Sequence, residues 1–228
     1  MNVPNITIAV DGYSSTGKSS FAKMLAREIG LLYLDSGALY RGVTFFAQEN
    51  GYITADNVVS EDLRPALGAL ELHFGDGGKL HMGERCIEEQ IRGMKVSSQV
   101  SPIAAVPYVR EFVDDKLHSL SRDGKVIMDG RDIGTTVFPD AQIKIFMTAS
   151  EQVRSERRYA EMLSKGLTPS FDDVRANLRE RDYIDSHREA SPLRRPADSY
   201  ELDNSNMTLK EEVEWAKGLI RGVCKLYD

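Results

Sequence analysis

Short apolar runs alternate with longer stretches of helical periodicity along most of this chain. The apolar runs are rich in β-branched residues, which is typical of strands buried on both faces of a parallel sheet. The alternation predicts an α/β fold in which helices flank a parallel five-stranded sheet. We expect the five strands at Ile6–Val10, Leu31–Leu34, Val126–Met128, Ile143–Met147 and Tyr200–Leu202.

Two helices are defined most clearly by this periodicity. The first follows Ile6–Val10 and ends at Gly30, which is placed as a C-terminal stop. The last begins at Thr208, where the residues up to Glu211 fit a capping box. We expect buried faces made of Phe21, Met24, Leu25 and Ile29 in the first helix, and of Val213, Ala216, Leu219, Ile220 and Val223 in the last.

One segment departs from this alternation. From Glu71 to Glu88, apolar and polar residues alternate on either side of Asp76-Gly77-Gly78-Lys79. This pattern predicts a β-hairpin, with a third short strand at Arg85–Glu88. A β-rich subdomain on top of the sheet and an ordinary antiparallel edge of the main sheet both fit the pattern.

The first strand leads directly into a phosphate-binding sequence, G-x-x-x-x-G-K-[ST]. A strand before it and a helix after it are the context in which such a loop binds phosphate through backbone N–H groups and the helix N-terminus. A glycine-rich turn with a solvated lysine is the alternative, which these flanks disfavour. We expect Lys18 to reach the outer phosphates and Ser19 to offer its hydroxyl to Mg²⁺. The residues expected to hold the phosphates of ATP are Gly12, Tyr13, Ser14, Ser15, Thr16, Gly17, Lys18, Ser19 and Ser20.

Composition narrows the class of protein. With 228 residues, 41% hydrophobic and 28% charged, the chain is an ordinary globular one. Its net charge of −6 disfavours nucleic-acid binding. No apolar stretch approaches the ~20 residues of a membrane span, so we expect no membrane partner. No Lys or Arg precedes Lys18, so a secretory signal is not expected, and we predict a cytoplasmic protein.

Arginines are concentrated between residues 150 and 196, where nine occur. Some are expected on the surface, paired with acids such as Glu180, Asp182 and Glu189. Two groups fall on single helical faces, and they suit a mobile helical lid over polyphosphate. These groups are Arg154 with Arg157 and Arg158, and Arg181 with Asp185 and Arg188.

The reaction class follows from what accompanies the loop. The D-x-x-G and N-K-x-D sequences of GTPase switches do not occur, and a small-molecule kinase fits best. Transfer to an alcohol would favour a general base. Transfer to a phosphate needs cations instead, and the many arginines therefore favour a phosphate acceptor and no general base.

Four further strings resemble the cytidylate kinase family, and the resemblance covers essentially the whole chain. They are LDSGALYR (34–41), SQVSPIAAVPYVR (98–110), DGRDIGTTVFPDA (129–141) and ERDYIDSHREASPL (180–193). The resemblance implies transfer of the γ-phosphoryl group of ATP to CMP or dCMP with Mg²⁺. It also implies one P-loop kinase domain over 1–228, with a monophosphate-binding insertion near 63–100 and an Arg-rich lid near 150–190.

The same resemblance assigns roles to individual residues. Arg41, Arg131 and Arg188 would hold the acceptor phosphate, Tyr40, Arg181 and Asp185 would face the sugar, and Ser101, Arg110 and Asp132 would read cytosine. Ser36 would cap a helix and contact substrate, and Asp129 would organise Mg²⁺ through water or hold arginines. Lys18, Arg131, Arg157, Arg158 and Arg188 would be catalytic. Two departures are Tyr13, where proline is common, and Asp203-Asn204-Ser205, which leaves the preference for ATP least secure.

Alternatives remain open at this point. A broader pyrimidine kinase that also accepts UMP differs mainly in how residue 132 reads the base. A regulatory nucleotide-binding protein without transfer activity is disfavoured by Lys18, Ser19 and Arg131 together, and an RNA-binding role by the acidic balance. We expect a monomer.

Overall fold

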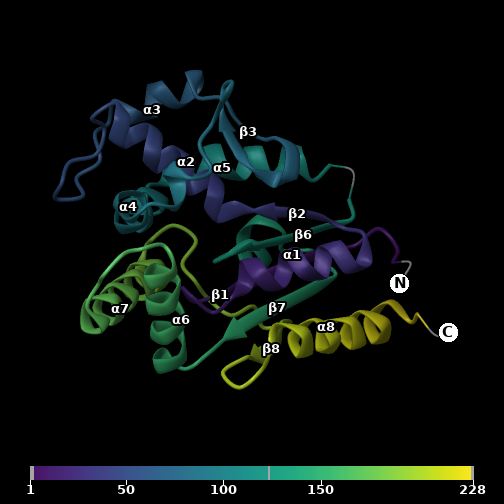
Figure 1. The fold of residues 1–228 in the computed structure, drawn as a ribbon. Helices are drawn as coiled ribbons and strands as arrows, with labels where there is room; N and C mark the ends of the chain where they lie inside the picture. Colours follow the sequence, from purple (N-terminus) through teal and green to yellow (C-terminus); the bar gives the residue numbers. More distant parts are fainter. Residues whose placement is uncertain (1–2, 123, 227–228) are drawn as a thin grey trace. The chain divides into compact units, whose positions relative to one another are not determined.

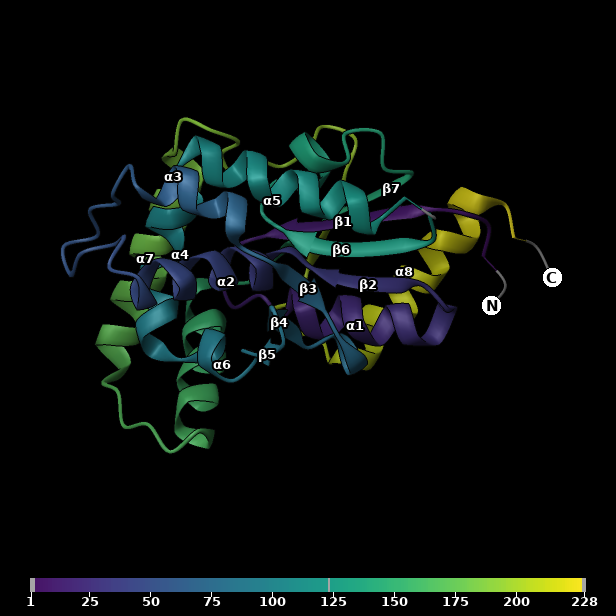
Figure 2. The ribbon, with the colours of Figure 1, turned by 90° about the horizontal axis from the view of Figure 1, so that it is seen from above.

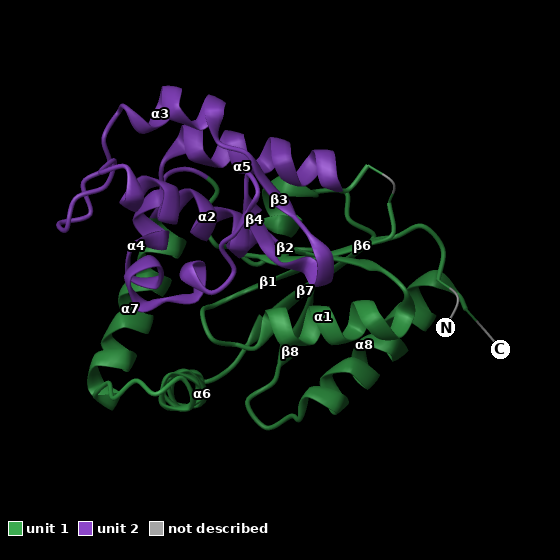
Figure 3. Cartoon of the chain, turned by 45° about the horizontal axis from the view of Figure 1, so that its top comes forward, with its two compact units in different colours: residues 1–34, 121–187, 191–228 green, residues 35–120, 188–190 purple. Residues whose placement is uncertain are grey.

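A computed structural model describes residues 3–122 and 124–226 of the protein. The chain divides into two compact units, which Figure 3 colours green and purple. Unit 1 consists of residues 1–34, 121–187 and 191–228, and unit 2 of residues 35–120 and 188–190.

Unit 1 is built on a parallel five-stranded sheet. All five predicted strands are confirmed, each with small differences at its ends. In spatial order they are β2 (Leu32–Asp35), β6 (Val126–Gly130), β1 (Thr7–Gly12), β7 (Ile143–Thr148) and β8 (Tyr200–Asp203). Because β1 is central, the loop that follows it lies between the carboxyl ends of β6 and β7, as the pairing of Asp11 with Gly130 and of Gly12 with Met147 shows.

Two helices, α1 (Lys18–Ile29) and α8 (Leu209–Cys224), pack side by side against the sheet (Figures 1 and 2). They share one hydrophobic core with β1, β6, β7 and β8, which includes Phe21, Leu25 and Ile220. The predicted ends are confirmed: Gly30 caps α1 in the left-handed conformation, and a capping box opens α8. The predicted burial of Val223 is wrong, because the helix turns this side chain outward and leaves it 36% exposed.

The Arg-rich segment forms two helices that pack against each other, α6 (Glu151–Ser164) and α7 (Phe171–His187) (Figure 1). A small apolar cluster of Met162, Val174 and Leu178 joins them, with Tyr159 packed against it. The helices are therefore held together by a core of their own, separate from the core under the sheet.

Unit 2 contains helices and a second, antiparallel sheet. The helices are α2 (Ser36–Glu49), α3 (Leu63–Ala66), α4 (Met94–Ala104) and α5 (Pro107–Leu120), and the strands are β3 (Leu72–Phe74), β4 (Leu80–Met82) and β5 (Arg85–Cys86). The predicted hairpin is confirmed, with a third strand that ends earlier than predicted. Since these strands form a sheet of their own, the alternative of an antiparallel edge on the main sheet is wrong.

The monophosphate-binding insertion near 63–100 and the lid near 150–190 stay predictions, since they concern which residues bind substrate and which segments move. No helix among the described residues has the length and apolar character needed to cross a bilayer.

Candidate active site

The phosphate loop leaves β1 through Gly12, where no other residue fits. A Cβ at this position would lie 2.1 Å from the carbonyl oxygen of Met147 on the neighbouring strand, and φ is +149°. Farther along, Ser15 at φ 59° and Gly17 at φ 93° turn the backbone through the left-handed region. Such turns make a concave run of N–H groups that suits an anion, and α1 begins directly after it.

Lys18 lies inside this loop and is 5% exposed. Its Nζ donates to the carbonyl oxygen of Tyr13 at 2.6 Å and to Oγ1 of Thr16 at 3.3 Å. Burial, followed by the charge of Arg131, lowers the pKa of Lys18 well below its usual value. An ammonium group held this way gains from a nearby polyanion, because phosphate charge offsets both effects.

Ser19 and Asp129, the two residues predicted to serve Mg²⁺, are in contact. Ser19 Oγ donates to Asp129 Oδ2 at 2.8 Å, and the hydroxyl of Tyr33 donates to Asp129 Oδ1 at the same distance. Hydroxyl and carboxylate oxygens are the donors that Mg²⁺ prefers. Among the described residues, no group of three or more His, Cys, Asp or Glu side chains is arranged so that it could hold a metal ion by itself. The residues present therefore fit a Mg²⁺ that takes its remaining ligands from water and nucleotide phosphates.

Arg131 follows β6 and joins the phosphate loop to α7. Its Nε donates to Asp185 Oδ2 at 2.8 Å, and its Nη2 donates to Ser14 Oγ at 3.0 Å. Burial opposes its charge, but Asp185, with smaller effects from Asp182 and Asp129, outweighs burial, so the pKa of Arg131 is raised above its usual value. The guanidinium is therefore fixed and charged beside the loop. Two further predicted residues of unit 1, Asp132 and Arg181, are 3% and 8% exposed.

The arginines of α6 make three different contacts. Arg157 donates to the carbonyl oxygens of Thr16 at 3.1 Å and of Asn204 at 2.9 Å. Arg154 pairs with Asp182 and also donates to the carbonyl oxygen of Ser14 at 3.2 Å. Arg158 pairs with Glu161, one turn along its own helix. Only the first two therefore touch the phosphate loop.

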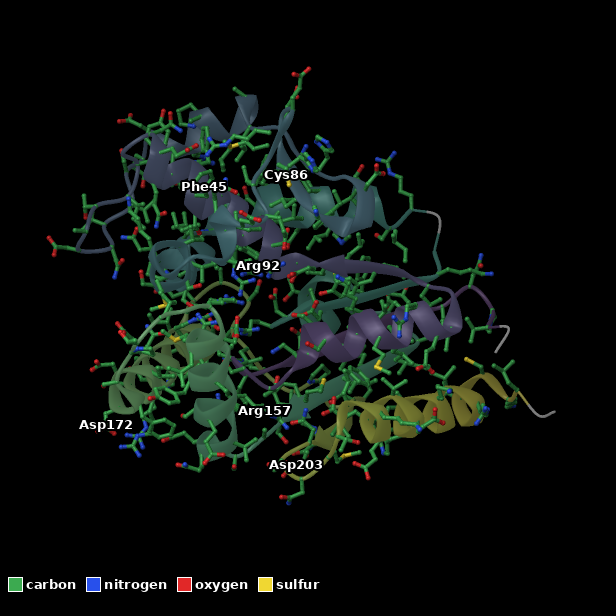
Figure 4. All side chains as sticks on the ribbon, in the orientation of Figure 1. Phe45, Cys86, Arg92, Arg157, Asp172 and Asp203 are labelled. Atoms are coloured by element: carbon green, nitrogen blue, oxygen red, sulfur yellow. The ribbon has the colours of Figure 1, made fainter. Side chains whose placement is uncertain are left out.

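Arg157, labelled in Figure 4, belongs to a partly buried network of hydrogen bonds at the loop. Asn204 Nδ2 donates to the carbonyl oxygen of Thr16 at 2.7 Å and to Glu212 Oε1 at 2.8 Å, while its Oδ1 accepts from Arg157 at 3.0 Å. Position 204, a departure from the family pattern, thus ties the loop to α6 and α8.

Unit 2 holds the other predicted substrate residues. The guanidinium of Arg110 lies 5.2 Å from the ring centre of Tyr40 and donates to the carbonyl oxygen of Ala104 at 3.1 Å. Ser36, Arg41, Ser101 and Arg188 also belong to this unit, and Ser36, Ser101 and Arg188 are buried. Asp132 belongs to unit 1, so the residues predicted to read the base divide between the two units.

The prediction that Ser36 is the N-cap of α2 is wrong. Asp35 holds that position, and its Oδ1 accepts from the N–H of Ala38 at 2.9 Å. Its other oxygen accepts from Arg92 at 2.8 Å. Burial works against the charged form, but Arg92 and Arg41 outweigh it and lower the pKa of Asp35. Asp35 immediately precedes Ser36, so a helix start assigned by residue type was one position late.

Two carboxylates beside the loop, one buried and one partly buried, escaped the sequence-based prediction. Asp11, 1% exposed, accepts from the N–H groups of Ile133 and Gly134. Asp182, expected on the surface, has a side chain only 14% exposed and contacts the loop. The position of Asp11 just ahead of the loop was the available signal for the first. On α7, Asp182 lies between the buried Arg181 and the exposed Tyr183, so the helical pattern alone did not decide whether it is buried.

Comparisons with a family model and with individual proteins both match the chain to cytidylate kinases. Residues 8–221 match the family model described as cytidylate kinase. A cytidylate kinase from Bacteroides thetaiotaomicron is 46% identical over 215 residues, which cover 92% of this chain and 94% of that protein. One from Flavobacterium psychrophilum is 44% identical over 223 residues, covering 96% and 99%. The solved structure of an uncharacterized protein from Eubacterium ventriosum aligns with a TM-score of 0.51 and 9% identity over 96% of this chain and 99% of that one. At that identity the likeness concerns the fold alone.

Proposed function

The chain belongs to the cytidylate kinase family, and from this premise we propose that it transfers the γ-phosphoryl group of ATP to CMP or dCMP, releasing ADP and CDP or dCDP. The two halves of such a reaction need different sites. The phosphate loop, residues 12–20, is the proposed donor site. The acceptor site is proposed to consist of Ser36, Tyr40, Arg41, Ser101, Arg110, Asp129, Arg131, Asp132, Arg181, Asp185 and Arg188.

The observation that carries the proposal is the position of Arg131. Its guanidinium bonds to Ser14 of the loop and is oriented by Asp185. A charged fork held this way can bind phosphate oxygens bidentately at the end of the donor triphosphate. It supports a phosphate acceptor, which is already ionised and needs no general base.

The chemistry is proposed to rest on charge and position. Lys18 and Arg131, with Arg157, Arg158 or Arg188, would stabilise the charge that spreads over the transferring group. Ser19, with Asp129 through water, would hold Mg²⁺, which supplies charge neutralisation on the donor phosphates when bound. Asp132 would accept from the amino group of cytosine and repel the carbonyl that uracil presents at that place.

A panel of monophosphates tests the function. ATP-dependent ADP release is measured with CMP, dCMP, UMP, AMP and GMP, with and without Mg²⁺. We expect CMP and dCMP to react fastest, and Lys18→Ala to slow the reaction about 100-fold or more. Faster turnover of UMP than of CMP would favour the broader pyrimidine kinase. ATP binding without transfer to any monophosphate would favour a regulatory protein.

A cytoplasmic location and a monomeric state are part of the same proposal. They are checked by cell fractionation and by the molar mass in solution.

A further inference from the structure

Asp182 on α7 places a carboxylate directly on the phosphate loop. Its Oδ1 accepts a hydrogen bond from the backbone N–H of Ser14 at 3.1 Å. Its Oδ2 accepts from Arg154 on α6, whose guanidinium also donates to the carbonyl oxygen of Ser14. The side chains of Asp182 and Arg154 are 14% and 10% exposed. One carboxylate thus joins both Arg-rich helices to the loop, within unit 1.

The groups around this carboxylate are those that bind a phosphate. A loop N–H and a guanidinium contact it directly. A second arginine lies beside the same loop residue: Arg131 Nη2 donates to Ser14 Oγ at 3.0 Å. A backbone N–H of a phosphate loop with two arginines beside it is the donor set expected for the phosphates of a nucleotide.

We propose that Asp182 is a competing anion of the donor site: it occupies the Ser14 N–H and Arg154, and the phosphates of ATP displace it from both. Two anions cannot share these donors without strong repulsion, so binding of the triphosphate transfers Arg154 from the carboxylate to phosphate. When the nucleotide leaves, the carboxylate takes the donors back. Asp182 is therefore a positioning residue that keeps Arg154 beside the loop and weakens nucleotide binding. This inference rests on the proposed use of the loop for ATP.

A purely structural ion pair makes the opposite prediction. If Asp182 only held α6 and α7 in place, its removal would loosen Arg154 and leave ATP binding unchanged or weaker. If it competes, its removal makes ATP bind more tightly. Losing one charge-assisted competitor corresponds to about a tenfold lower Kd. The sign of the change therefore separates the two roles.

The experiment is calorimetric titration of the full chain with ATP and Mg²⁺, and separately with CMP. Asp182→Asn is compared with Glu180→Gln, which removes a charge from an exposed position on the same helix. We expect Asp182→Asn to lower the Kd and the KM for ATP about tenfold. The Kd and KM for CMP should stay unchanged, and Glu180→Gln should bind both nucleotides as the wild type does.

The melting temperature of each variant is measured alongside. If Asp182→Asn does not fold, Asp182→Ser is the second variant, since it removes the charge and leaves a small polar side chain at this position. An unchanged or higher Kd for ATP in a variant with the wild-type melting temperature overturns this inference alone. A wild-type chain that does not bind ATP overturns the proposed function, and this inference with it.

Discussion

Replacing Asp11 with Asn removes a buried ionisable carboxyl group next to the phosphate loop at almost constant volume. The two carboxylate oxygens accept from the N–H of Ile133 at 2.8 Å and of Gly134 at 2.7 Å. These amides begin the π-helical turn Ile133–Val137, directly after Arg131 and Asp132. Asn offers one accepting oxygen, and its amino group faces the other N–H donor.

The pH dependence of stability reports on this carboxyl group. Burial raises the pKa of Asp11 from 3.8 to about 7, although the two N–H bonds act in the opposite direction. Between these values the folded protein retains a proton that the unfolded chain has released, so the free energy of unfolding falls as pH rises. Between about pH 5 and about pH 8, the effect accumulates only up to the pKa of the folded state, about 7. This part of the range spans roughly two pH units, which corresponds to about 3 kcal/mol of unfolding free energy. The Asn variant lacks this contribution.

Urea unfolding at the two pH values measures the effect. We expect the wild type to lose about 3 kcal/mol relative to Asp11→Asn between about pH 5 and about pH 8. Asp140→Asn is the matched control, because Asp140 is an exposed aspartate of the same unit. Its stability should follow the wild type at both values. Parallel pH profiles for the wild type and Asp11→Asn would show that the pKa of Asp11 is not raised in the folded protein.

Three further substitutions test other parts of the structure. Gly12→Ala should lower the free energy of unfolding in urea by about 3 kcal/mol or more, because the alanine Cβ would lie 2.1 Å from the carbonyl oxygen of Met147. A loss under about 1 kcal/mol would contradict the backbone described for the loop. Thr208→Ala removes the capping box with Glu211, so the melting temperature should fall by about 2–4 °C while activity is kept. An unchanged melting temperature would mean that the cap does not stabilise the fold. Asp132→Asn should lower the preference for CMP over UMP, measured as the ratio of the two kcat/KM values, about tenfold, while ATP binding stays the same. Unchanged selectivity would show that other residues recognise the base.

Local patterns predicted much of the fold. The five strands, the glycine stop of α1 and the Thr208 cap each depend on residues close in sequence, whose spacing carries the information. The separate antiparallel sheet was one of two alternatives, since a hairpin pattern does not say what the hairpin packs against. Val223 shows the limit of periodicity at a helix end, where the pattern continues but the core does not.

Contiguous residues are enough to predict the phosphate loop, the α/β architecture and the membership of the family, because each depends on local spacing or on a continuous motif. Which acids lie against that loop depends on contacts between residues far apart in the sequence. Asp182 is 168 residues from Ser14 along the chain, and Asp11 is 122 residues from Ile133. An acidic residue on a charged helix has the same local signature whether it faces water or a backbone N–H. The packing of α6 and α7 and the order of the strands make that choice.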